Sequence, residues 1–168
     1  NTVIARIRYD NDRKYGFEVG SGCSDTDGLK GSYFYAQGGS FTTDGEFKIQ
    51  GASYSKTGVN PAHATIASDS VVTARIVRVG ANTGDGKASL NLIGGGTLVA
   101  GTVNSIPNRR GTSEINANGG KIVFPDGYAV LEQGCFLDAI NIYEGGLEVC
   151  CERQIYLGNA GTNALLWT

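Results

Sequence analysis

Hydrophobic and polar residues alternate with a period of two in many short runs of the chain. In residues 2–9, Val3 and Ile7 fall on one face of an extended chain, and Arg6 falls on the other. Such alternation is typical of a β-strand with one packed face and one solvated face. We expect strands at residues 2–9, 15–19, 32–36, 40–43, 46–50, 71–79, 87–93, 97–103, 121–124, 128–131, 136–143 and 147–157.

One segment departs from this pattern. Residues 61–70 begin with Pro61, a residue that favours the first position of a helix, and continue with Ala62, Ala64 and Ile66. The spacing of these apolar residues makes the segment the nearest candidate for a helix, and we expect at most one short helix in the chain.

Glycine separates the predicted strands. The 26 glycines fall between runs rich in Val, Ile, Thr, Tyr and Phe, and the steps Gly38-Gly39 and Asp44-Gly45 are typical of hairpin turns. The clearest hairpin joins residues 136–143 to 147–157 through Gly145-Gly146, and residues 104–120 are expected to be the longest irregular segment. The fold class predicted is all-β, an antiparallel β-sandwich or jelly-roll-like barrel with short hairpins.

The length and net charge of the chain limit the number of domains and the kinds of partner that we expect. A chain of 168 residues fits one β domain at residues 1–168, with two small lobes meeting near 104–120 as the alternative. With 14 basic and 16 acidic residues the formal net charge is −2, so we expect no nucleic-acid partner. No run of about 18 apolar residues is present, so we expect no membrane span.

Residue types that carry catalysis or bind metals are sparse. His63 is the single histidine, and Asp25 and Asp27 form part of a loop that lacks the other ligands of a calcium site. The triple glycine at residues 94–96 is not followed by the Gly-Lys-Ser/Thr of a phosphate loop. We therefore expect no enzyme, no cofactor and no metal site.

The cysteines leave two alternatives open. Cys23, Cys135, Cys150 and Cys151 lack the paired spacing of a zinc site. Buried free thiols are the first interpretation, and one disulfide that joins Cys23 to Cys135 or to Cys150 is the second.

Aromatic residues suggest contact surfaces. Tyr33 and Tyr35 share one face of a predicted strand, where they would stack on sugar rings, enter a subunit interface or pack in the core. Near the end of the chain, Leu165, Leu166 and Trp167 form an apolar segment that is costly to expose to water, so we expect an interface there.

The last third of the chain resembles a known class of protein. Residues 121–128 (KIVFPDGY), 134–139 (GCFLDA) and 146–152 (GLEVCCE) are similar to the ends of small structural proteins of tailed bacteriophages, although Cys150-Cys151 stands where a β-branched or aromatic pair is usual. The resemblance implies a β-sandwich on the virion surface, commonly trimeric, that decorates or cements the capsid. Its implied partners are further copies of itself and a major capsid protein.

The expected function is therefore that of a non-enzymatic structural subunit, a viral capsid decoration protein. Two alternatives remain, a secreted carbohydrate-binding or adhesive module and a subunit of a pilus or tail tube. Because the apolar end would lie between subunits, deletion of residues 163–168 is expected to weaken assembly more than folding.

Overall fold

The regular structure of the described part of the chain is β-strand. The computed structural model describes residues 5–9, 15–20, 31–54, 58–81, 86–106, 111–125, 137–149, 155–157 and 164–166. The strands are β1 (Ala5–Tyr9), β2 (Tyr15–Gly20), β3 (Ser32–Gln37), β4 (Ser40–Tyr54), β5 (Gly58–Asn60), β6 (Ala62–Ala67), β7 (Val71–Ala81), β8 (Lys87–Ile93), β9 (Thr97–Asn104), β10 (Thr112–Phe124), β11 (Ala139–Val149), β12 (Ile155–Leu157) and β13 (Ala164–Leu166).

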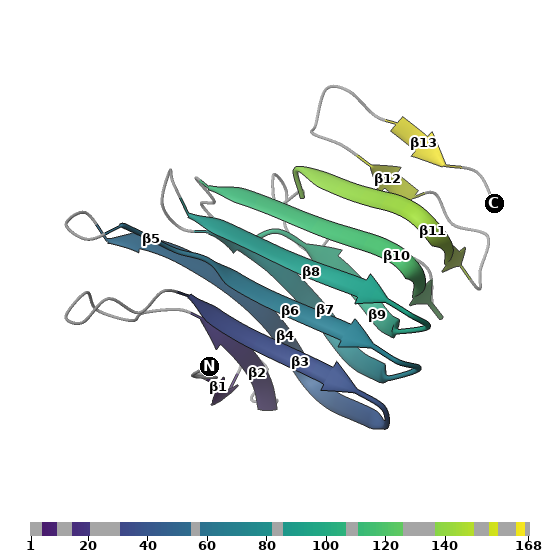
Figure 1. The fold of residues 1–168 in the computed structure, drawn as a ribbon, viewed down its shortest axis with the longest axis horizontal. Coiled ribbons are helices and arrows are strands. Elements are labelled where there is room, and N and C mark those ends of the chain that lie inside the picture. The colour runs from purple at the N-terminus through teal and green to yellow at the C-terminus, as the bar shows by residue number, and fades with distance from the viewer. Residues whose placement is uncertain are drawn as a thin grey trace.

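Nine of these strands pair in parallel and form a β-solenoid of about four turns. In Figure 1, β3, β6, β8, β10 and β11 lie side by side in the front layer, and β2, β4, β7 and β9 lie behind them. Strand β10 joins the layers, because residues 112–118 pair with β8 while residues 121–123 pair with β9.

Each turn of the solenoid is here called a coil. After one coil the chain runs beside its own earlier strand, in parallel and in register. Ser32 pairs with Ala62, 30 residues further on, and Ala62 pairs with Ala88, 26 residues further on. From Ser89 to Glu114 and from Glu114 to Ala139 the step is 25 residues. Side chains at equivalent positions are therefore stacked in columns, which run across the strands.

The predicted antiparallel sandwich or jelly-roll is wrong, although the all-β class is confirmed. The glycine pair Gly38-Gly39 joins β3 to β4, and these two strands do not pair with each other. Instead the pair makes a corner between the two layers, with φ angles of 74° and 78°. Ser68 and Asp69 (52° and 59°) and Gly94 and Gly95 (52° and 86°) occupy the corresponding corners of the next coils. Two successive left-handed residues are also the signature of a tight hairpin, so turn chemistry alone does not distinguish the two structures.

Three further local predictions are corrected. Residues 62–67 are strand β6 and not a helix: Ala62, Ala64 and Ile66 are buried, and the residues between them are half-buried. Residues 112–124, most of whose length was expected to be irregular, form the long strand β10. The hairpin through Gly145-Gly146 does not form, because β11 runs through both glycines and pairs in parallel with β10.

The core consists of stacked apolar columns between the layers. One column runs from Phe34 through Ala64, Leu90 and Ile115 to Ile140, one residue from each coil. Burial of such side chains contributes about 25 cal/mol for each Å² of apolar surface removed from water. The columns therefore hold successive coils in register.

A cluster of phenylalanines fills the first coil, which is also the longest. Phe17 comes from β2, Phe34 from β3, and Phe41 and Phe47 from β4, and their ring centroids lie 5.0–6.4 Å apart. Phe47 is completely buried. In the next coil the equivalent positions hold the smaller side chains of Ala64, Val72 and Val77.

The outer side of the rear layer carries paired charges. Lys48 Nζ lies 3.6 Å from Glu18 Oε1, and Arg78 forms an ion pair with Glu46. At the N-terminal edge of this layer β1 pairs antiparallel with β2, which covers an edge that could otherwise recruit another strand.

Candidate functional site

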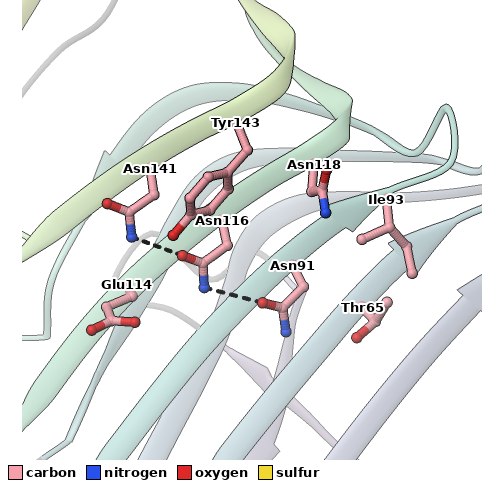
Figure 2. Close-up of a pocket in the computed structure, with 8 residues that line it drawn as sticks. All are labelled: Thr65, Asn91, Ile93, Glu114, Asn116, Asn118, Asn141 and Tyr143. Atoms are coloured by element: carbon pink, nitrogen blue, oxygen red, sulfur yellow. Dashed lines mark hydrogen bonds between the residues drawn. The ribbon is translucent and has the colours of Figure 1, made fainter.

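A shallow groove lies on the outer side of the front layer, across β6, β8, β10 and β11. It has a volume of about 670 Å³ and is open to solvent. Figure 2 shows the eight residues that line this groove: Thr65, Asn91, Ile93, Glu114, Asn116, Asn118, Asn141 and Tyr143.

Three asparagines form a ladder along the floor of the groove. The register stacks Asn91, Asn116 and Asn141 at one position of three successive coils. Asn116 Nδ2 donates to Asn91 Oδ1 over 3.1 Å, and Asn141 Nδ2 donates to Asn116 Oδ1 over 2.8 Å (Figure 2). Parallel strands about 4.8 Å apart place identical side chains at hydrogen-bonding distance, as in other amide ladders. We call these three residues the asparagine ladder.

The ladder continues at one end into a hydroxyl and an imidazole. Asn91 Nδ2 donates to Ser89 Oγ over 3.5 Å, and Ser89 Oγ lies 2.6 Å from His63 Nδ1. Burial, and secondarily the charge of Lys87, hold the pKa of His63 below its usual value of 6.5. His63 is then neutral at pH 7, and its Nδ1 shares a hydrogen bond with the Ser89 hydroxyl. The ring of Tyr33 packs on His63, with centroids 5.5 Å apart.

The contact between Ser89 and His63 invites comparison with a nucleophile and its base. Such a pair needs a third group that orients the imidazole through its other nitrogen. Among the residues that the structure describes, none bonds Nε2 of His63. Within the described residues the pair therefore extends the hydrogen-bonded row of the ladder.

The remaining lining residues give the groove an apolar side and a negative charge. Tyr143 is 71% exposed, and Figure 2 shows its ring lying beside the hydrogen bond between Asn141 and Asn116. Glu114 is half-buried, and none of the described residues that line the groove is Lys or Arg. The described lining thus carries one carboxylate and no basic side chain.

The ladder leaves hydrogen-bonding capacity unused. A side-chain amide offers two N–H donors and an oxygen with two lone pairs. The two contacts of Asn116 within the ladder use one donor and one acceptor site, so one of each remains. The row therefore presents alternating donors and acceptors that repeat at the strand spacing, next to an exposed aromatic ring.

The residues singled out in the sequence are placed as follows. Tyr33 and Tyr35 do share the outer face of β3, being 43% and 57% exposed, as predicted. Leu165 and Leu166 belong to β13, which pairs with β12, and their side chains lie outside the described residues. The positions of Cys23, Cys135, Cys150, Cys151 and Trp167 also lie outside the described residues, so the proposed disulfide and interface remain predictions.

Sequence reasoning missed the asparagine ladder, although a signal was present. Each ladder asparagine stands between two apolar residues, in Leu-Asn-Leu, Ile-Asn-Ala and Ile-Asn-Ile, and glycines follow within a few residues. The triplets centred on Asn91, Asn116 and Asn141 recur every 25 residues, as do the hydrogen bonds that join them. A search for an internal repeat near this period would have indicated stacked coils.

Other site classes find little support in the described part of the chain. No three His, Cys, Asp or Glu side chains come together there in a way that could hold a metal ion. The described residues also include no helix that is long and apolar enough to cross a membrane.

Comparisons of the chain with protein-family models, with curated protein sequences and with solved structures found no significant match.

Proposed function

We propose that this protein is a non-enzymatic β-solenoid module that binds glycans in the groove over the asparagine ladder. The observation that carries the proposal is the row of side-chain amides from Asn91 to Asn141, half-buried in an open groove beside exposed Tyr143.

The chemistry of the row suits a ligand rich in hydroxyl groups. A hydroxyl both donates and accepts, so it can bond the free N–H of one amide and the free oxygen of the next. Because the amides are already fixed by their bonds to one another, they lose little side-chain entropy on binding. A chain of sugars that lies across the strands would meet the same pattern at each coil.

The aromatic residue supports the same class of ligand. Sugar rings have apolar faces, and an exposed tyrosine offers a flat apolar surface with a polar tip. Tyr143 is the most exposed of the large hydrophobic residues described, and it lies at the groove. Tyr33 and Tyr35 lie on the same outer face, on β3, which places them on the far side of β6 and β8 from β10 and β11.

A glycan array followed by isothermal titration calorimetry tests the proposal. Asn116→Ala is expected to weaken binding of a glycan found on the array about tenfold, because one hydrogen-bonding amide is worth about 1.4 kcal/mol. Asn141→Ala, which removes only the end of the ladder, provides a milder second variant. The matched control is Thr42→Ala, an exposed residue of β4 outside the groove, which should bind as the parent does. Absence of glycan binding, or equal binding by Asn116→Ala and the parent, would contradict the proposal.

A structural role in a larger assembly is a second proposal, and a different observation favours it. Within the described residues β3 pairs only with β6, and β11 pairs only with β10, so each has one edge without a strand. Such edges can recruit a neighbouring chain. Decoration of a viral capsid, as the sequence resemblance implies, is one form of this role, and a pilus or tail-tube subunit is another.

Light scattering and electron microscopy of the purified protein test this second proposal. Discrete oligomers or particles bound to a capsid would support the first form, and filaments would support the other. A protein that stays monomeric at high concentration and binds no larger particle would contradict both.

A further inference from the structure

We propose that the groove selects glycans without acidic groups, and that Glu114 is the residue that sets this selectivity. The inference rests on the proposed function, since it concerns which members of one ligand class the same groove accepts.

Glu114 lies in a row of its own, next to the asparagine ladder. The register aligns Tyr33, His63, Ser89 and Glu114 on the outer side of four neighbouring strands, two residues before the row that contains the ladder. On β10 itself, Glu114 and Asn116 therefore point to the same side and line the same groove.

The carboxylate of Glu114 has no partner among the described residues. The basic side chains near other carboxylates are engaged elsewhere, since Lys121 Nζ lies 2.9 Å from Glu148 and Lys48 lies 3.6 Å from Glu18. Lys87 begins β8 two residues before Ser89 and does not line the groove. Removing a carboxylate from water is costly unless a partner compensates, and Glu114 is half-buried. The fold alone gives no reason for an unpaired one at this position.

A ligand with hydroxyl groups supplies the hydrogen-bond donors that Glu114 lacks among the described residues. A carboxylate accepts hydrogen bonds only, and bonds from hydroxyls to a charged oxygen are stronger than bonds between neutral groups. A glycan that carries its own carboxylate, sulfate or phosphate would instead bring a second negative charge beside half-buried Glu114, where the described lining offers no basic side chain. Repulsion between like charges at a binding site is a common means of lowering the affinity for a wrong ligand.

The experiment compares ligands that differ only in charge. Maltohexaose, cellohexaose and mannohexaose are each titrated by calorimetry beside a derivative in which the primary hydroxyls are oxidised to carboxylates. For at least one pair we expect the neutral sugar to bind and the oxidised sugar to bind at least tenfold more weakly. In Glu114→Gln that ratio should fall to less than threefold. Glu148→Gln, which removes an exposed negative charge outside the groove, serves as the matched control and should keep the ratio of the parent.

The outcomes separate this inference from the proposed function. Equal or tighter binding of an oxidised sugar by the parent overturns the inference and leaves glycan binding in place. An unchanged ratio in Glu114→Gln also overturns it, because another group then sets the selectivity. Binding of none of the six sugars overturns the proposed function, and the inference with it.

Discussion

Asn91 and Asn116 are 25 residues apart in the sequence and lie at one position of two successive coils, where Asn116 Nδ2 donates to Asn91 Oδ1 over 3.1 Å. This contact depends on the parallel register of β8 and β10, since a shift of one residue would turn one of the side chains to the core. The register that builds the fold therefore also builds the groove floor.

The middle of the ladder should contribute measurably to stability. Asn116→Ala removes both bonds of the central amide and is expected to lower the free energy of unfolding by about 1–2 kcal/mol. Asn118→Ala on the same strand is the matched control, with an expected change below about 0.5 kcal/mol because Asn118 is exposed. Urea unfolding followed by circular dichroism measures both. Equal effects of the two substitutions would show that the ladder bonds do not form in solution.

Gly120 of β10 should not tolerate a side chain, because the backbones of neighbouring coils approach closely there. A Cβ on Gly120 would lie 2.5 Å from the carbonyl oxygen of Gly96 and 2.7 Å from Leu92, whereas a Cβ on Gly146 would meet nothing within 4 Å. Gly120→Ala is expected to lower the free energy of unfolding by about 1–3 kcal/mol. Gly146→Ala should change it by less than about 0.5 kcal/mol. The midpoint of thermal unfolding is measured for both variants. A midpoint of Gly120→Ala equal to that of the parent would contradict the close stacking of the coils.

The phenylalanine cluster should be the most sensitive part of the first coil. Phe47→Ala removes a completely buried ring that contacts three others, at an expected cost of about 3–5 kcal/mol. Phe47→Leu fills most of the space and should cost less. Denaturant unfolding of the two variants gives the comparison. A loss below about 1 kcal/mol for Phe47→Ala would mean that the first coil does not pack on the core as described.

His63 should make stability depend on pH in a defined direction. Its pKa is lower in the folded protein than the usual 6.5, so below that pH the unfolded chain binds protons more readily than the folded one. The contribution of neutral His63 is therefore complete above pH 6.5 and is lost as the pH falls through the window below it. The free energy of unfolding should fall more between pH 7.5 and pH 5 in the parent than in His63→Gln. An identical fall in both would show that His63 is not buried beside Ser89.

Strand positions were largely predictable from the sequence, because alternation of apolar and polar residues reports burial of one face whatever the partner strand. The prediction at 87–93 coincides with β8, and that at 71–79 covers most of β7. Where the buried residues of a strand are small and apolar, as Ala62 and Ala64 are in β6, the same residues also suit a helix. That ambiguity produced the incorrect expectation of a helix at residues 61–70.

Strand pairing was not predictable from local pattern. Parallel and antiparallel partners require the same alternation, and the corner at Gly38-Gly39 uses the backbone angles of a hairpin turn. Pairing is decided by residues about 25 positions away, such as Asn116 for Asn91, and local windows do not include them. The groove was missed for the same reason, since it exists only once three coils are stacked.

The proposal that the asparagine ladder binds glycan is tested in one NMR titration. Side-chain amide signals of ¹⁵N-labelled protein are followed as a glycan that binds on the array is added. The signals of Asn91, Asn116 and Asn141 should shift together, while that of Asn104, completely buried in β9, should stay in place. Saturable shifts confined to another face of the protein, with the three ladder signals unchanged, would contradict the proposal.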